Sequence, residues 1–411
     1  MRKLTVKNFS VIKEAELEFG KITVLIGPQS SGKSLLCRLA FFFSQYVPEF
    51  ANNVAQRHPP FKEINDAIQS RFSDWFPATT WSNQDSEITY TEGSYSVTAS
   101  IGALQTKPLL RFSHSFSEAY SKWNSSEAGE VRKSNSNSEP NVDPFYPSGS
   151  IYIPSGRAFF STPNKGFVSM SQKNLDWITQ RFSTEVDFEY RAMIASSSER
   201  VELLHDFGEQ TERILKGRVV FWDGAPRFQF TSDPRILPFD LLSSGTLELL
   251  PMLNPLSTLV SNTKFSKYFE EQDPMRGPIF VEEPESGIFP ATQYELVCLF
   301  AWLTATKSLG LSFALTTHSP YLLSSFNNLI YAGQLANEKP ELKDEIARTV
   351  PKRYWIENGS FRAYSIHDGI LKSILSESGL INGEYLDSVS DTIGNEFDSL
   401  LRLEYDHTEA S

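Results

Sequence analysis

The sequence predicts an α/β fold in which short buried strands alternate with helices around one sheet. Residues 22–26 form an apolar run that leads directly into a glycine-bearing loop and then into an apolar helix over 33–47. Residues 277–282 and 312–317 are further apolar runs, and each ends in polar side chains. Runs that are apolar at every position are typical of strands in a sheet whose two faces are both covered by helices.

The N-terminal part of the chain has a different pattern. Residues 3–9 and 14–19 alternate apolar and polar side chains, and further alternating runs lie within 86–113. Such alternation is typical of strands that have one solvated face. We expect Pro48 to end the helix over 33–47, because proline cannot donate a backbone hydrogen bond inside a helix.

The remaining segments give weaker signals. Residues 121–150 are rich in Ser, Asn, Glu and Pro and predict a flexible surface loop. Residues 172–217 have apolar positions at helical spacing and predict a modest helical insertion, whereas 218–230 return to a strand pattern. A further strand is expected at 327–332, followed by a partly helical and acidic C-terminal segment.

Composition narrows the class of protein. No run of about 18 apolar residues occurs, so no transmembrane helix is expected. The N-terminus has no apolar run of the secretory kind, and Cys37 and Cys298 are expected to be buried free thiols, so the prediction is a cytoplasmic protein. The net charge of −12 argues against strong non-specific binding along DNA, although it leaves a local basic patch open.

The loop after the first apolar run has the pattern of a phosphate-binding loop, G-P-Q-S-S-G-K-S. Its glycines let backbone N–H groups surround an anion, and the following helix directs its positive end to the same place. We expect Lys33 to reach the β- and γ-phosphates of ATP and Ser34 to hold Mg²⁺. The predicted nucleotide contacts are Gly27, Pro28, Gln29, Ser30, Ser31, Gly32, Lys33, Ser34 and Leu35.

Two later strand ends carry candidate catalytic groups. Ile279–Glu285 reads I-F-V-E-E-P-E, and neighbouring side chains at a strand end point in different directions. We therefore predict that Glu282 holds Mg²⁺ and that Glu283 acts as a general base. His318 ends the run over 312–317 and is predicted to sense the γ-phosphate. A solvated strand end and a structural histidine are the alternatives.

A fourth motif is Leu242–Leu250, which reads L-S-S-G-T-L-E-L-L and precedes Pro251. Ser243, Ser244 and Gly245 lead into an apolar helix. Alone, a serine at this position predicts only an ordinary helix cap. A functional role for it depends on the motifs that accompany it.

Taken in order, these motifs resemble the ABC-type ATPase heads of the RecF, structural-maintenance-of-chromosomes (SMC) and OLD (overcoming lysogenization defect) proteins, as an OLD-like member of the AAA-family ATPases. The opening L-T-V-K-N-F…F-G-K-I-T-V-L-I-G-P-Q-S-S-G-K-S is similar to theirs at almost every position. F-V-E-E-P-E-S-G-I-F-P resembles the OLD acidic motif, T-T-H-S-P-Y-L-L their histidine switch, and L-S-S-G-T the ABC signature loop.

The resemblance implies a P-loop NTPase of the ABC/SMC-head type, with an antiparallel N-terminal β subdomain, a mainly parallel sheet with flanking helices, and a helical insertion. The expected division is an ATPase head at 1–120 and 218–345, a flexible loop at 121–150, a strand plus helical insertion at 151–217, and a C-terminal extension at 346–411. Glu282 stands where such proteins more often have aspartate, and Ser244 where many have glycine.

The resemblance also implies that two heads form a homodimer, or a higher homo-oligomer, head to tail. Each ATP would then lie between the phosphate loop of one head and Ser243, Ser244 and Gly245 of the other. I-Y-I-P-S-G-R resembles a segment of OLD-like ATPases, so Arg157 would line the nucleotide site or the dimer interface. An ordinary surface arginine is the alternative.

The chain lacks the pattern of long coiled-coil arms and of a C-terminal nuclease domain. In this it resembles ATPase subunits of bacterial anti-phage defence systems such as Septu, PARIS and the retron-associated ATPases. The function this implies is an ATPase whose head dimerisation controls a separate effector, a nuclease, with no membrane contact. The alternatives are a RecF-like DNA repair or recombination ATPase that binds nucleic acid, and a nucleotide-gated scaffold with little turnover.

Overall fold

The fold is described from a computed structural model. The described residues are 2–55, 59–103, 105, 107–124, 150–161, 176–184, 186, 202–261 and 277–382. Most of the loop predicted at 121–150, and residues 187–201 of the predicted helical insertion, therefore lie outside the described residues. No helix within the described ranges is long and apolar enough to cross a membrane.

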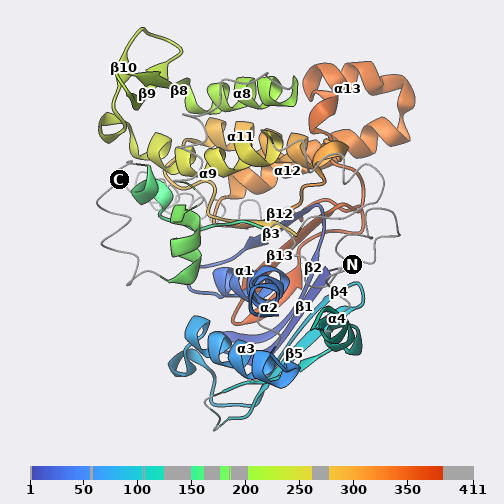
Figure 1. The fold of residues 1–411 in the computed structure, drawn as a ribbon. Helices are drawn as coiled ribbons and strands as arrows, with labels where there is room; N and C mark the ends of the chain where they lie inside the picture. Colours follow the sequence, from blue (N-terminus) through green and yellow to red (C-terminus); the bar gives the residue numbers. More distant parts are fainter. Residues whose placement is uncertain are drawn as a thin grey trace, which may run out of the picture.

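Eleven strands form one sheet in the order β6-β5-β4-β1-β2-β14-β13-β3-β12-β11-β7 (Figure 1). Its strands are β1 (Arg2–Phe9), β2 (Ile12–Phe19), β3 (Ile22–Ile26), β4 (Ser86–Glu92), β5 (Tyr95–Ile101), β6 (Leu109–Phe112), β7 (Tyr152–Ile153), β11 (Ile279–Glu282), β12 (Phe313–Thr317), β13 (Phe361–His367) and β14 (Ile370–Ser373). A second, small sheet consists of β8 (Gly217–Trp222), β9 (Ala225–Phe230) and β10 (Ile236–Leu237).

The large sheet has two parts of different kinds. Strands β13, β3, β12, β11 and β7 pair in parallel, and we call them the parallel half. Strands β6, β5, β4, β1 and β2 pair antiparallel, and we call them the antiparallel wing. Strand β14 joins the two parts. The predicted arrangement of an N-terminal antiparallel subdomain beside a mainly parallel sheet is confirmed.

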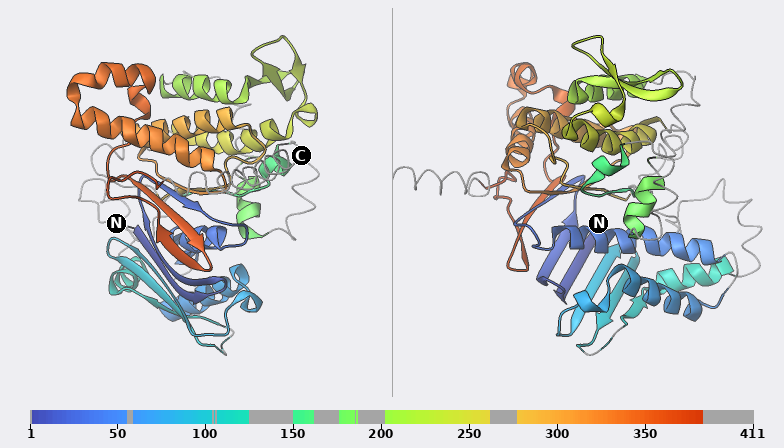
Figure 2. Two further views of the ribbon diagram at one scale, coloured as in Figure 1. Left: turned by 180° about the vertical axis from the view of Figure 1, so that it is seen from behind. Right: turned by 90° about the vertical axis from the view of Figure 1, so that its left-hand side faces the viewer.

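Helices cover both faces of the parallel half, whereas in the antiparallel wing they cover one face (Figures 1 and 2). They are α1 (Lys33–Phe41), α2 (Val47–Ala55), α3 (Phe61–Trp75), α4 (His114–Asn124), α8 (Glu202–Leu215), α9 (Ser244–Ser261), α11 (Pro290–Ala305), α12 (Pro320–Glu338) and α13 (Lys343–Thr349). Helices α9, α11 and α12 lie on one side of the parallel half, and α1 lies on the other (Figure 1). Helix α8 packs on α9 and α11.

The apolar runs of the parallel strands are explained by these two layers. In β11, Ile279 and Val281 belong to the core beneath α9 and α11, whereas Phe280 belongs to the core beneath α1. Strand β12 divides in the same way, with Leu315 in the first core and Ala314 in the second. Successive side chains of a strand point to opposite faces, so a strand covered on both sides must be apolar throughout.

The helix after β3 continues past Pro48, so the prediction that it ends there is wrong. Helix α1 passes through a π-helical turn at Phe42–Tyr46 into α2, and Pro48 is the second residue of α2. Proline crowds the carbonyl four residues before it and leaves that carbonyl without its helical donor. The wider turn immediately before Pro48 accommodates both effects.

The strand predicted at 327–332 is also wrong, because these residues lie within α12. The hydroxyl of Ser319 accepts hydrogen bonds from the amides of Tyr321 and Leu322 and caps the helix. Leu322, Leu329 and other side chains at helical spacing are buried along one face of α12. The capped start and this helical spacing extend the helix through a segment that, read alone, has the composition of a strand.

The last strands of the sheet come from the segment expected to be a C-terminal extension. Strand β13 pairs directly with β3, with Phe361 opposite Ile22 and Ser365 opposite Ile26. Strand β14 then pairs with β2. The segment 346–411 thus contributes two strands to the sheet, because β3 needs a hydrogen-bonding partner on the side away from β12.

Candidate nucleotide site

The phosphate loop connects β3 to α1 in a tight path. A side chain at Gly27 would place its Cβ 2.4 Å from the carbonyl oxygen of Ile366 in β13, so only glycine fits there. Gly32 has φ 106° and Ser30 has φ 58°. These left-handed values bend the loop, and glycine adopts them at little cost. Pro28, Gln29 and Ser30 form the exposed tip of the loop.

Lys33 folds back into the loop. Its Nζ donates hydrogen bonds to the carbonyl oxygens of Gly27 and Pro28, each at 2.8 Å. Burial lowers the pKa of Lys33, and the negative charges of Glu283 and Glu285 oppose that shift. The ammonium group therefore lies in the loop, within the electrostatic influence of those two carboxylates.

The loop has the features that a phosphate group requires. The hydroxyl of Ser31 is buried and has no hydrogen-bond partner within the described residues. The Lys33 ammonium and the N-terminal end of α1 supply positive charge at the same place. Ser34 is half-buried in the first turn of α1, and Leu35 packs against the core beneath that helix. The predicted loop residues thus surround one anion-binding position.

Glu282, at the end of β11, has a carboxylate held by protein groups. It is 3% exposed. Its Oε1 accepts a hydrogen bond from the Tyr152 hydroxyl at 2.6 Å and lies 3.8 Å from Nε of Arg38. Its Oε2 accepts from the Ser155 amide at 3.1 Å and from the Ser155 hydroxyl at 3.2 Å. Both oxygens of the predicted Mg²⁺ ligand are therefore engaged.

Glu283 has the opposite environment. Its carboxylate is half-exposed, and its Oε1 lies 3.7 Å from Nε2 of His318 at the end of β12. Its backbone has φ 43°, an uncommon value for a residue other than glycine, and its amide donates to the carbonyl oxygen of Thr316 at 2.9 Å. Strands β11 and β12 pair in parallel, and this brings the predicted base and the predicted sensor together.

Glu285 is a site residue that sequence reasoning missed. Its Oε1 accepts hydrogen bonds from the Thr317 hydroxyl and from the His318 amide, each at 2.7 Å. Its Oε2 is buried and has no hydrogen-bond partner among the described residues. Glu285 thus fixes the backbone from which His318 projects. The sequence signal that could have identified Glu285 is its place as the third carboxylate of the E-E-P-E run.

Arg157 lies elsewhere than predicted. It is 0% exposed, so it neither lines the nucleotide site nor lies on the surface. Its guanidinium donates to the carbonyl oxygens of Pro154 at 3.1 Å, Glu248 at 3.0 Å, Glu282 at 2.8 Å and Glu283 at 3.1 Å. The reason is geometric, because the turn after β7 directs the side chain under the end of β11. Arg157 therefore holds the backbone of Glu282 and Glu283, which we call the acidic pair.

The signature-like loop (residues 242–246) lies against the loop that follows β11 in the same chain (residues 283–288), which we call the acidic loop. The hydroxyl of Ser243 accepts a hydrogen bond from the amide of Thr246 at 3.3 Å, so this serine caps α9. Ser243 and Ser244 are exposed, whereas Gly245 is buried. A Cβ at Gly245 would lie 2.5 Å from the carbonyl oxygen of Gly287. The two exposed serines remain available to a ligand, and Gly245 allows the close approach.

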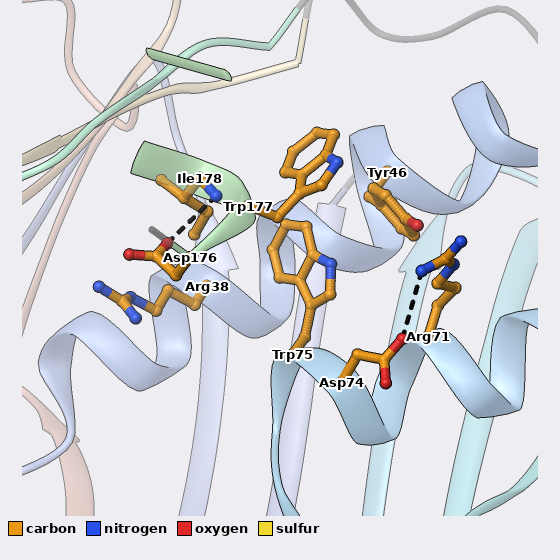
Figure 3. A pocket seen from close by; sticks show the side chains of 8 residues that line it. All are labelled: Arg38, Tyr46, Arg71, Asp74, Trp75, Asp176, Trp177 and Ile178. Carbon is orange, nitrogen blue, oxygen red and sulfur yellow. Dashed lines mark hydrogen bonds and ion pairs between the residues drawn. The ribbon is translucent and has the colours of Figure 1, made fainter. Parts of the chain in front are cut away.

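A pocket of about 230 Å³ is lined in part by Arg38, whose Nε lies 3.8 Å from the Glu282 carboxylate (Figure 3). It is lined by Arg38, Tyr46, Arg71, Asp74, Trp75, Asp176, Trp177 and Ile178. Asp74 pairs with Arg71 at 3.3 Å, and Asp176 accepts hydrogen bonds from the amides of Ile178 and Thr179. The two arginines and two aspartates balance each other in charge.

A phosphate loop between a buried parallel strand and a helix, with carboxylates and a histidine on the adjacent strand ends, defines a P-loop NTPase fold of the ABC/SMC-head type. The sequence model of one family, described as "AAA domain, putative AbiEii toxin, Type IV TA system", matches residues 22–324. This match spans well over half of the chain and includes the phosphate loop, the signature-like loop, the acidic run after β11 and His318. The chain belongs to this family.

Solved structures of SMC heads are similar over most of the chain. The SMC head domain from Thermotoga maritima has a TM-score of 0.38 and 11% identity, and the match covers 91% of this chain and 98% of that chain. The SMC head bound to the C-terminal winged-helix domain of ScpA has a TM-score of 0.41 and 12% identity, covering 90% and 96%. An SMC head with an extended coiled coil, bound to the C-terminal domain of ScpA derived from Pyrococcus furiosus, has 0.39 and 12%, covering 91% and 96%. The search of curated proteins gave no match.

Proposed function

We propose that this chain binds and hydrolyses ATP with Mg²⁺ at the site formed by the phosphate loop and the ends of β11 and β12. The observation that carries the proposal is the convergence of Lys33, Glu283 and His318. The negative charge of Glu283 acts on the Lys33 ammonium inside the loop, and the Glu283 carboxylate lies 3.7 Å from the His318 ring. Phosphoryl transfer needs this combination of a cation, a carboxylate that orients water and a polar group near the leaving phosphate.

The phosphate loop would hold the triphosphate through the backbone amides of Gly27–Ser34 and the Lys33 ammonium. Ser34 and Glu282 are the residues that would hold Mg²⁺, which neutralises phosphate charge when bound. Glu282 would do so by exchanging one of its contacts with Ser155 or Arg38, since both of its oxygens are engaged. The hydroxyl of Ser34 has no hydrogen bond to a described residue that it would need to exchange for the metal.

Glu283 would accept a proton from the attacking water. Its half-exposed carboxylate is open to solvent, whereas that of Glu282 is buried. His318 would contact the γ-phosphate oxygen, with its backbone held by Glu285. The strained backbone of Glu283 fits this role, because such conformations persist where the surrounding structure fixes a functional group.

Steady-state phosphate release tests the ATPase proposal. We expect Glu283→Gln to lower kcat by about 100-fold or more, since a positioned general base contributes about that much. Glu338→Gln, at the exposed end of α12, is the matched control and should leave kcat unchanged. Equal and near-zero rates for wild type and Glu283→Gln would instead support a nucleotide-gated scaffold.

We further propose that two copies of the chain close head to tail around ATP. Support comes from exposed apolar side chains beside the motifs. Leu241, two residues before Ser243, is 64% exposed, Phe289, after the acidic loop, is 76% exposed, and Tyr321, near His318, is 57% exposed. Exposed apolar groups gathered around a polar site are typical of an interaction surface. Ser243 and Ser244 of one copy would then contact the γ-phosphate held by the other.

The dimer proposal has its own test. Phe289→Ser should weaken ATP-driven dimerisation by about 10-fold or more in sedimentation velocity, since aromatic anchors dominate many interfaces. Tyr331→Ser is the control, because Tyr331 is 53% exposed and lies farther along α12. Equal dimerisation of the two variants would contradict the proposed interface.

We also propose that this ATPase acts in the cytoplasm and controls a separate effector, a nuclease, in anti-phage defence. The family description supports a system of more than one component, since it names a putative toxin of a type IV toxin–antitoxin system. The test is co-expression with the neighbouring genes, followed by co-purification and phage challenge. The expected result is a complex and protection that Lys33→Ala abolishes. Absence of both complex and protection would remove the defence proposal without affecting the ATPase proposal.

A further inference from the structure

Arg157 connects two motifs that would serve different nucleotides in the proposed dimer. Its guanidinium donates to the carbonyl oxygen of Glu248, in the second turn of α9, and to the carbonyl oxygens of Glu282 and Glu283. Nε of Arg157 also lies 3.7 Å from the Glu248 carboxylate. Helix α9 begins at the signature-like serines, and Glu283 directly follows β11. The buried side chain of Arg157 therefore joins helix α9 to the end of β11.

This connection is stiff for physical reasons. A guanidinium is planar, carries its donors in a fixed fork and stays charged in proteins. Burial lowers the pKa of Arg157, and the negative charges of nearby glutamates, Glu248 first, oppose that shift. If α9 moved without the acidic strand end, a buried and charged donor would lose its acceptor, which is unfavourable. The helix and the strand end therefore move together.

Further contacts also fix the start of α9 to the residues around it. The first turn of α9 lies directly on the acidic loop at Gly245 and Gly287, with no space for a Cβ at Gly245. The hydroxyl of Ser161, at the end of the turn that carries Arg157, donates to the carbonyl oxygen of Leu247 in α9. The start of α9 is thus fixed to the acidic loop on one side and to the Arg157 turn on the other.

We propose that Arg157 is a positioning residue that transmits the contact of Ser243 with the partner's nucleotide to Glu283 of its own chain. The two ATP sites of a dimer would then hydrolyse in concert. Glu283 is suited to respond, because its backbone is strained and is held from opposite sides by Arg157 and Thr316. The inference rests on the proposed head-to-tail dimer and assigns a regulation to it.

A double-mutant cycle separates transmission from a merely structural role. The variants are Ser243→Ala, Arg157→Lys and the double substitution, measured by kcat and by the Hill coefficient for ATP. Lysine keeps the charge but loses the fork, so it cannot hold all of the carbonyl oxygens. Arg213→Lys on α8 is the matched control, since this arginine bonds the Tyr354 hydroxyl, remote from the site.

Transmission predicts that each single substitution lowers kcat by about 10-fold and that the double variant is no slower than the slower single one, because both interrupt one path. The Hill coefficient should fall toward 1 in Arg157→Lys and remain at the wild-type value in Arg213→Lys. Two effects that multiply, to about 100-fold, would overturn the inference. If Arg157→Lys does not fold, Glu248→Gln takes its place in the same cycle, with the same non-additivity expected.

Failure of this inference can be distinguished from failure of the ATPase proposal. If wild type hydrolyses ATP but Ser243→Ala alone leaves kcat unchanged, the ATPase proposal stands and the inference is overturned. If wild type hydrolyses no ATP, the ATPase proposal itself is overturned.

Discussion

The parallel half and the antiparallel wing share one sheet, yet only the parallel half carries the candidate site. In the parallel half, strands β3, β11 and β12 run in the same direction, so their carboxyl ends meet at one edge. The phosphate loop, the acidic pair and His318 follow those ends. In the wing, successive ends lie at opposite edges because neighbouring strands run in opposite directions. Strand direction decides where functional side chains gather.

The parallel half and the antiparallel wing also differ in the hydrogen bonding of their buried polar groups. In the wing, the Tyr90 hydroxyl donates to Glu92 and the Tyr95 hydroxyl to the carbonyl oxygen of Phe43, and burial holds the pKa of both tyrosines well above the usual value. In the parallel half, Ser31 and Glu285 each keep a buried oxygen without a hydrogen-bond partner among the described residues. A bound ligand can satisfy buried oxygens of this kind beside the phosphate loop.

The largest functional effect is expected from Lys33→Ala in the parallel half. We expect loss of detectable ATP binding by calorimetry and loss of ATP-driven dimerisation, because the ammonium is the cation inside the loop. The fold should persist, since Lys33 bonds only carbonyl oxygens of its own loop. Normal dimerisation of this variant on ATP would contradict the account.

The largest stability effect is expected from Phe72→Ala, in the layer that packs on the wing. Phe72 is fully buried and contacts the rings of Phe9 and Phe76, so truncation should cost about 3–5 kcal/mol in urea unfolding. The KM for ATP should remain within about twofold. Leu109→Ala, half-exposed on β6, is the control, and a change above about 0.5 kcal/mol there would weaken the comparison.

A smaller stability effect is expected from Tyr152→Phe in the parallel half. The change removes the hydroxyl that donates to the buried Glu282 carboxylate at 2.6 Å. An incompletely bonded buried carboxylate should lower the free energy of unfolding by about 1–3 kcal/mol. Tyr331→Phe, which is exposed, should have no effect. Equal stabilities of the two variants would show that Glu282 is not held as described.

The smallest effect is expected from Glu357→Gln, next to the parallel half. The hydrogen bond and charge of Lys21, 2.9 Å away, lower the pKa of Glu357 below its ordinary value of 4.5. A depressed carboxyl pKa stabilises the fold above the unfolded-state value, and that contribution disappears as the pH falls through the folded-state value. At pH 7 the loss should be below about 0.5 kcal/mol, because the pair is exposed. A loss that does not change between pH 7 and pH 3 would contradict this assignment.

Local sequence patterns were enough to predict the phosphate loop and the strand ends. The order of β3, its loop and α1 is encoded within one continuous stretch, and so is the run Ile279–Glu285. The parallel register of β11 beside β12 then brings Glu283 and His318 together.

The partners of these motifs could not be predicted in the same way. Tyr152 and Arg38 reach Glu282 from distant parts of the chain, and Arg157 reaches Glu283 from the turn after β7. Strand β13 was missed because its central place depends on pairing with β3, far away in sequence. Such long-range contacts leave no periodic signal in the sequence.

The central claim is that the parallel half forms one half of a composite ATP site. Sedimentation velocity of Glu283→Gln with Mg²⁺ and ATP tests it most directly, since slow hydrolysis should hold the closed state. We expect a dimer with ATP, a monomer without it, and a monomer under both conditions for Lys33→Ala combined with Glu283→Gln. A Glu283→Gln protein that stays monomeric at saturating ATP, or a double variant that dimerises equally well, would contradict the account.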